Sequence, residues 1–478
     1  MHDLKTPIVC NSETHRAVTK LIYYSAVLVV VLILLPGCQS QEISLQLDSQ
    51  FTQTPTRWQT SLDTKESAVS LWGVELPEPI WKYLDEVKLS NSQIQVSALQ
   101  MRKMMLENQI ASATLWPSVK LQSIHRSAQT LDPEQNLNQL NTLGMSAAWE
   151  IDLWQRLADS GEQSYWLLSA SRFELAAVQQ SIQSQLLVTW LDVIEQHKLI
   201  DLNTINQVNQ KRRLQMSLLR LDSGLAESLD VRIARTNLLR LQEAEKNILF
   251  KKNKALRRLQ MILGRYPTAA EIESLELPQL KPLNVLETPK DILLGRPDIL
   301  EAEAKLMAAG LAWRVAEKNK LPKLTLNVTY DARRSDVSQL FDVDSWLAAI
   351  TSSLVQPIFN AGKLESQAQK AKLQQQIMLK KYQGVILSAW QEVENGLHNE
   401  MTLQQREILL IEALSEAKQA EIQTEEQYLS GLASSFELLA AQRTRINVES
   451  DVIKLATLRV KNRINLRLAL GLQNAEKS

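Results

Sequence analysis

The chain has 478 residues, of which 53 are basic and 53 are acidic, so its formal net charge at pH 7 is zero. This balance, without any cluster of lysine and arginine among aromatic residues, argues against nucleic acid as a partner. The five histidines show no metal-ligand spacing, and the glycines form no phosphate-binding loop, so we expect no metal, no cofactor and no enzyme activity.

The chain begins with the features of a secretory signal. Arg16 and Lys20 precede an apolar run at residues 21–35, which is too short to span a membrane comfortably. We therefore expect residues 1–37 to be removed during export. After residue 35 no apolar run approaches the length of a transmembrane helix, so any spanning of a membrane must be done by strands closed into a barrel.

A cysteine lies directly behind this signal. Residues 35–38 (LPGC) resemble a bacterial lipobox, in which the cysteine is acylated and becomes the mature N-terminus, and Gln39 resembles the pattern routed to the outer membrane. We therefore expect lipid attachment at Cys38; the alternative is an ordinary signal followed by an incidental cysteine. Removal of the signal would take Cys10 with it, so no disulfide is expected.

The next elements are a helix and two strands. Residues 91–115 fit a helix that leads into a weak strand candidate beginning at Ser118. In residues 143–154, apolar side chains at the odd-numbered positions alternate with mainly small or acidic side chains at the even-numbered ones. This period of two is typical of a strand with one apolar face.

A long helical hairpin follows. Residues 162–223 contain neither Gly nor Pro and fit a helix about 90 Å long. Gly224 interrupts the pattern, and residues 225–263 fit a second helix that ends at Gly264. The second helix has a seven-residue apolar repeat, which indicates coiled-coil packing. The repeat consists of Ala234, Leu238, Leu241, Ile248, Ala255, Leu259 and Ile262.

The second half of the chain predicts two more strands and another helical block. Residues 323–330 and 346–354 alternate like the earlier strand, and residues 358–478 contain no proline. Four strands of about ten residues suit a tilted transmembrane barrel, and the alternative is a half-buried soluble sheet. The smallest such barrels use about eight strands, so several chains would have to share one.

The two halves repeat one structural unit. Residues 223–228 (SGLAES) match residues 430–435 (SGLASS) at an offset of 207, and Gly264 matches Gly471 at the same offset. Within a unit, the two shorter helices together nearly equal the long one, so we expect them to stack end to end beside it. The expected domains are a signal at 1–37, a lipid-anchored segment at 38–90, repeat 1 at 91–270, an equatorial linker at 271–295, repeat 2 at 296–471 and a tail at 472–478.

Four motifs at the ends of these elements carry a resemblance to a known family. They are residues 149–154 (WEIDLW), 356–362 (QPIFNAG), 428–431 (YLSG) and 468–471 (LALG). In this order and spacing the chain resembles outer-membrane efflux proteins of the TolC type, in the lipoprotein branch of multidrug and metal efflux systems. The resemblance implies a mixed α and β membrane protein built from two internal repeats. It also implies a homotrimer, in which a twelve-strand transmembrane β-barrel continues into a periplasmic α-helical coiled-coil tunnel.

The resemblance also implies a function and a location. Such proteins are passive exit ducts in the outer membrane of Gram-negative bacteria. They conduct substrates delivered by an inner-membrane pump through a periplasmic adaptor, and the pump selects the cargo. Two other classes stay open on the sequence. A periplasmic adaptor would give no barrel signal after outer-membrane extraction, and a lipid-anchored coiled-coil scaffold would not conduct ions in a planar bilayer.

The resemblance assigns two sets of site residues. The hairpin tips would dock the adaptor, and a gate at the periplasmic end would join a tyrosine hydroxyl on one hairpin to an acidic residue on the other. Ala433 departs from the family, because some members have an arginine there. The alternative for the acids is an ordinary place in the first turn of a helix, where the helix dipole favours them. The tip residues are Gly224, Leu225, Ala226, Gly431, Leu432 and Ala433, and the gate residues are Asp230, Tyr428 and Glu437.

Overall fold

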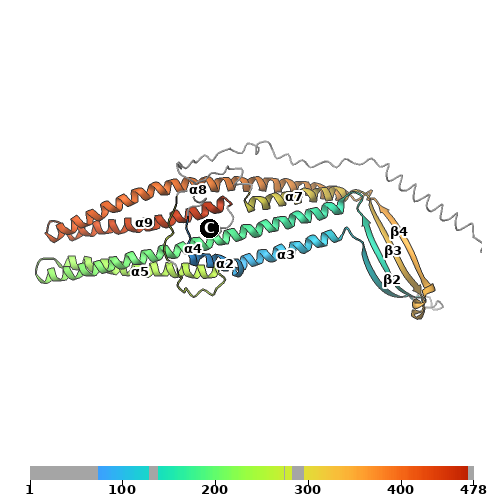
Figure 1. The fold of residues 1–478 in the computed structure, drawn as a ribbon, viewed down its shortest axis with the longest axis horizontal. Helices are drawn as coiled ribbons and strands as arrows, with labels where there is room; N and C mark the ends of the chain where they lie inside the picture. Colours follow the sequence, from blue (N-terminus) through green and yellow to red (C-terminus); the bar gives the residue numbers. More distant parts are fainter. Residues whose placement is uncertain (1–73, 129–137, 274, 282–294, 472–478) are drawn as a thin grey trace, which may run out of the picture. The chain divides into compact units, whose positions relative to one another are not determined.

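The computed structural model describes residues 74–128, 138–273, 275–281 and 295–471 (Figure 1). The expected signal and Cys38 lie outside the described residues. Within those four ranges, no helix has the length and apolar character needed to cross a membrane. The main elements in chain order are α2 (Glu78–Ser90), α3 (Ser92–Ala113), β1 (Ser118–Ala128), β2 (Asn138–Ile151), α4 (Arg156–Asp222), α5 (Ser228–Ile262), α7 (Pro297–Lys318), β3 (Lys323–Arg334), β4 (Trp346–Val355), α8 (Lys363–Leu429) and α9 (Ser435–Ala469).

The four strands form one antiparallel sheet in the order β1-β2-β3-β4. All four were expected from the alternating sequence pattern, and the weak candidate at Ser118 is β1. Strands β1 and β4 are the two edges of the sheet, and the side chains of β1 are exposed along its whole length. The edges of the sheet therefore leave backbone donors and acceptors without a strand partner in the described chain.

The boundary between β2 and α4 differs from the expectation. The strand ends at Ile151 instead of running to residue 154, and the helix begins at Arg156 instead of residue 162. The reason is Asp152, whose carboxylate accepts hydrogen bonds from the backbone N–H groups of Leu157, at 3.1 Å, and Ala158, at 2.8 Å. Gly161 lies inside the helix, because an interior glycine costs only about 1 kcal/mol relative to alanine.

The entering helix is preceded by a helix that the sequence pattern did not predict. Helix α2 buries Ile80, Leu84 and Val87, and a break at Asn91 separates it from α3. The Asn91 side-chain oxygen accepts hydrogen bonds from the N–H groups of Gln93 and Ile94, as an N-cap does. The chain therefore turns at Asn91, whose side chain caps the start of α3.

Each long helix runs beside two shorter helices, as expected from their lengths. Helix α4 packs against α3 and α5, and α8 packs against α7 and α9 (Figure 1). The junctions between the stacked helices are bonded by side chains, because Asn91 Nδ2 donates to the Ile262 carbonyl at 2.8 Å and Arg296 Nη1 donates to the Ala469 carbonyl at 2.6 Å. Helix α4 also packs against α7 and α9, which joins the two repeats.

A core cluster of buried apolar side chains lies where α2, α4, α5 and α9 meet. Trp190 and Leu186 of α4 are fully buried there, next to Ile80, Leu259 and Ile464. Helices α4 and α5 belong to repeat 1, α9 belongs to repeat 2, and α2 lies just before repeat 1. Burial between the repeats therefore supplies the cohesion that disulfides give to many exported proteins.

Candidate gate and docking site at the hairpin tips

Both hairpins end in the same backbone motif. The N–H of Leu225 donates to the carbonyl of Arg220 at 2.7 Å, and the N–H of Leu432 donates to that of Gln427 at 2.8 Å. Between helix and tip, Gly224 and Gly431 have φ of 71° and 78°, which a β-carbon disfavours. These bonds form the Schellman pattern and close the ends of α4 and α8.

The expected docking residues lie around these glycines. Leu432 is 82% exposed, and Leu225 is exposed as well. Ala226 and Ala433 are half-buried beside them. Each tip thus exposes a large apolar side chain directly after its glycine.

The two acids expected at the gate both complete capping boxes. Asp230 accepts a hydrogen bond from the N–H of Glu227 at 3.2 Å, at the start of α5. Glu437 accepts from the N–H and the hydroxyl of Ser434 at 2.6 and 2.9 Å, at the start of α9. The bonds from the Ser434 N–H and hydroxyl lower the pKa of Glu437. Both acids therefore have the helix-start role that the sequence left open as the alternative.

Tyr428 lies in the last turn of α8 and contacts the other hairpin. The guanidinium carbon of Arg220 is 5.0 Å from the centre of the Tyr428 ring, and Arg220 Nη1 donates to the Tyr428 carbonyl at 3.4 Å. A cation over an aromatic face is attracted by the ring. This contact joins α4 to α8 close to both tips.

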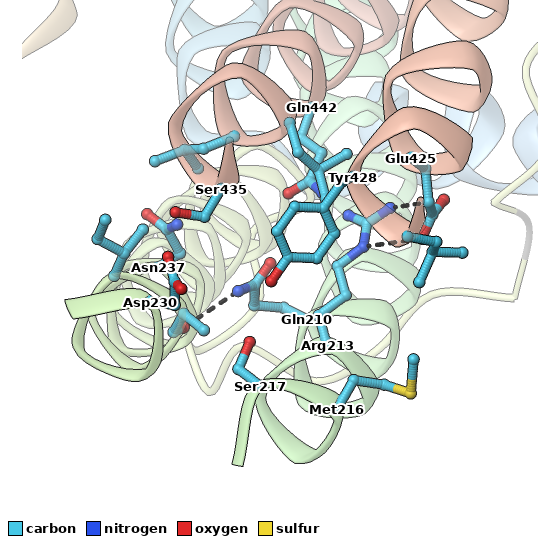
Figure 2. A pocket seen from close by; sticks show the side chains of 15 residues that line it. Gln210, Arg213, Met216, Ser217, Asp230, Asn237, Glu425, Tyr428, Ser435 and Gln442 are labelled. Carbon is cyan, nitrogen blue, oxygen red and sulfur yellow. Dashed lines mark hydrogen bonds and ion pairs between the residues drawn. The ribbon is translucent and has the colours of Figure 1, made fainter. Parts of the chain in front are cut away.

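Tyr428 and Asp230 line one open pocket between the two hairpins (Figure 2). Helices α4, α5, α8 and α9 all contribute walls, and the Tyr428 hydroxyl points into the space. Across the described residues no hydrogen bond joins the Tyr428 phenol to the Asp230 carboxylate, and Glu437 is not part of the lining. The structure thus places two of the three expected gate residues together.

An ionic cluster links the two hairpins on the side of the pocket away from the tips. Arg213 Nη2 of α4 lies 3.0 Å from Glu421 Oε1 and 3.2 Å from Glu425 Oε2, both on α8. The second Glu421 oxygen lies 2.5 Å from Arg445 Nε of α9, and Arg445 also donates to Asn206 of α4 at 2.6 Å. Glu421 is buried between guanidinium groups of both hairpins, so loss of this carboxylate would leave like charges facing each other.

Sequence reasoning did not identify this cluster. The pair Glu421 and Glu425, four residues apart on one helical face, was the local signal available. Their partner Arg213 is 208 residues away from Glu421. No local pattern connects positions so distant, and only the packing of α4 against the second hairpin brings them together.

Comparison with known proteins places the chain in a family. Its sequence matches the outer membrane efflux protein family over residues 83–265 and 288–472. It is 26% identical over 437 residues to the pyoverdine export outer membrane protein OpmQ of Pseudomonas putida, covering 87% of this chain and 91% of OpmQ. It is 24% identical over 403 residues to the cation efflux system protein CusC of Escherichia coli, covering 81% and 85%.

Solved structures have the same fold. The crystal structure of CusC superimposes with a TM-score of 0.81 at 21% identity, covering 87% of this chain and 97% of CusC. The open-state MtrE outer membrane channel of Neisseria gonorrhoeae superimposes with a TM-score of 0.78 at 19% identity, covering 88% and 95%. The family match spans both repeats, including the sheet and both hairpins, and the chain therefore belongs to the outer membrane efflux protein family.

Proposed function

We propose that the protein is the passive outer-membrane exit duct of a tripartite efflux or secretion system. One observation carries the proposal: a single unit joins a four-stranded sheet with two unpaired edges to two matched helical hairpins. A lipid-anchored scaffold or a periplasmic adaptor has no use for such a sheet. The family is one of efflux channels, not of enzymes, and we propose that this member catalyses no reaction and holds no cofactor.

The open edges of the sheet support a trimer. Four strands cannot close by themselves, because the smallest transmembrane barrels have about eight strands. Pairing of β4 of one copy with β1 of the next satisfies both edges at once. Three copies would then give twelve strands and carry six hairpins on one side of the barrel.

The partners follow from the passive role. The chain has no nucleotide-binding motif, so energy must come from an inner-membrane pump, reached through a periplasmic adaptor that docks at the hairpin tips. Relatives of this chain are named for the export of pyoverdine, toluene and cations. Such unlike cargoes support a duct that passes what its pump selects.

The function is tested by conductance. The purified, detergent-solubilised full-length protein should have the mass of a trimer in native mass spectrometry and should form ion-conducting pores in planar bilayers. Restored drug resistance in a strain that lacks its own outer-membrane channel would support the same conclusion. Monomeric protein without conductance would overturn the duct in favour of a scaffold.

We also propose that the pocket between the hairpins is part of a gate that keeps the tunnel closed at rest. Tyr428 and Asp230 would supply a bond across the hairpins, and Glu437 is the corresponding acid at the start of α9. A hydrogen bond to a charged acceptor contributes roughly 1.5 to 3 kcal/mol. Three copies of such a bond could hold the hairpins together and still yield to a docked adaptor.

The gate is tested with Tyr428→Phe combined with Asp230→Ala. The double variant should raise single-channel conductance and make cells sensitive to vancomycin. Because Asp230→Ala also removes a helix cap, Ser434→Ala is the matched control: it weakens the cap of α9 and leaves the pocket lining intact. Equal conductance of the double variant and the parent protein would place the gate outside this pocket.

A further inference from the structure

We propose that copies of this chain join head to tail through an electrostatic seam, in which the outer face of α5 on one copy meets the outer face of α8 on the next. The inference rests on the proposed trimer and specifies its helical interface. It is carried by the order of the helices, by the charges that they expose and by the spacing of those charges.

The order of the helices leaves α5 and α8 at opposite flanks. Taken as whole helices, α5 packs on α4, α4 packs on α9, and α9 packs on α8, while side chains of α4 and α5 also reach α8 and α9. Each flanking helix therefore has one packed side and one uncovered side. A row with two different flanks closes into a ring when each copy presents its α5 to the α8 of the next copy.

The uncovered face of α5 carries mostly basic side chains, with exposed apolar side chains between them. The helix contains nine basic and three acidic residues. Leu239 and Phe250, 58% and 63% exposed, lie on the same face as Arg232, Lys246 and Arg257. Among the described residues these three cations have no carboxylate partner within salt-bridge distance. Their charges are therefore available to another chain.

The uncovered face of α8 has the opposite charge. Between residues 392 and 426 the helix carries nine acidic and two basic residues. Ile408 and Ile422, 62% and 51% exposed, lie on the same face as Glu412 and Glu426. Among the described residues no cation lies within salt-bridge distance of either carboxylate. Two adjacent copies would thus bring together apolar groups ringed by opposite charges.

Contacts within the chain fix the relative height of the two faces. Arg443 of α9 bonds to Asn237 of α5. Arg445, two residues further along α9, bonds to Glu421 of α8. Position 239 of α5 therefore lies nearly level with Glu421. Helix α5 runs away from the tips and α8 runs toward them, so with distance from the tips the residue numbers rise along α5 and fall along α8. Residues at equal distances from this common level therefore lie at the same height to within about one helical turn.

The spacing of the charges then matches. Fourteen residues separate Arg232 from Lys246, and fourteen separate Glu412 from Glu426. Four residues beyond Lys246 lies Phe250, and four residues before Glu412 lies Ile408. Side by side and antiparallel, the helices bring Arg232 to Glu426, Lys246 to Glu412 and Phe250 to Ile408. Contact between two α5 faces or two α8 faces would place like charges together, so the seam also excludes wrong pairings.

Charge reversal tests the seam. Arg232→Glu with Lys246→Glu, and separately Glu412→Lys with Glu426→Lys, should each reduce the detergent-stable trimer about tenfold, because like charges then face each other. All four changes together should restore it. Arg240→Glu with Arg258→Glu is the control: it reverses two exposed cations a third of a turn away from Lys246 and should leave the trimer intact. Equal trimer yields for the first two variants and the control would overturn the seam.

Cysteine cross-linking separates the seam from the proposed function. Lys246→Cys with Glu412→Cys should give disulfide-linked dimers and trimers on oxidation, and Arg240→Cys with Glu412→Cys should give monomers. If the protein conducts and has the mass of a trimer, but the first pair stays monomeric on oxidation, the seam is wrong and the duct stands. If no variant and no parent protein forms trimers, the proposed function itself fails.

Discussion

Gly264 and Gly224 have the same backbone conformation in different surroundings. Their φ angles are 70° and 71°. A β-carbon on Gly264 would lie 2.5 Å from the Ser90 carbonyl oxygen, and one on Gly224 would meet nothing within 4 Å. The first glycine therefore permits a close approach between α5 and α2, and the second permits a turn alone.

We predict that Gly264→Ala destabilises the protein more than Gly224→Ala. Each substitution costs about 1 to 2 kcal/mol for the left-handed backbone, and the first adds a clash with backbone that cannot move freely. Thermal unfolding followed by circular dichroism should show the lower midpoint for Gly264→Ala. Equal midpoints would show that the contact with Ser90 relaxes without cost.

The cap at Glu437 predicts a dependence of stability on pH. Hydrogen bonds from Ser434 hold its pKa below the ordinary value of 4.5 in the folded protein. The cap therefore stabilises the fold fully above that value, and the contribution is lost as the pH falls through the lowered pKa. In Glu437→Gln the amide oxygen still accepts the capping hydrogen bond but does not titrate. The thermal unfolding midpoint of this variant should therefore fall less below pH 4.5 than the midpoint of the parent protein.

The control for this measurement is Glu243→Gln, which removes an exposed carboxylate in the middle of α5. Its midpoint should follow the parent protein through the same acid range. A Glu437→Gln curve that coincides with the parent at every pH would show that the capping bond carries no charge-dependent stability.

At the scale of elements, one side chain starts α3 and closes the junction with α5. Asn91 accepts two backbone hydrogen bonds at the start of α3 and donates one to the buried end of α5. We predict that Asn91→Ala lowers stability by about 1 to 2 kcal/mol from the cap, plus about 1 kcal/mol for the acceptor left without a donor. Denaturant unfolding should measure the sum.

Asn91→Ser separates the two contributions. Serine caps a helix nearly as well as asparagine, but its hydroxyl is too short to retain the bond to the Ile262 carbonyl. Its free energy of unfolding should therefore lie between those of the parent and Asn91→Ala. A serine variant as unstable as the alanine variant would assign the whole effect to the junction.

At the scale of the whole molecule, we propose that Cys38 carries a lipid and that the sheet provides a second hold on the outer membrane. Stable anchoring by lipid takes more than one signal. Cys38→Ser should therefore still reach the outer membrane, in lower abundance, when fractions are separated on a sucrose gradient. Recovery of all the variant as soluble periplasmic protein would contradict a membrane role for the sheet.

Local patterns determined most of the architecture. The period of two in residues 323–330, the absence of Gly and Pro across residues 162–223 and the paired tip glycines Gly224 and Gly431 each depend on side chains close in sequence. Such signals predict strands, helices and turns, because backbone geometry is set by near neighbours. The helix lengths within each repeat then predicted that the short helices stack beside the long ones, and four motifs at the ends of strands and helices carried the resemblance to the family.

Tertiary structure decided what joins distant positions. The ion pairs of Arg213 with Glu421 and Glu425 depend on which helices pack together, and no local period encodes that choice. The first turn of α4 is a local exception, because Asp152 caps it through bonds to residues only five and six positions later in the chain. Sequence therefore determined the elements and their family, and packing between the two repeats determined which charged side chains meet.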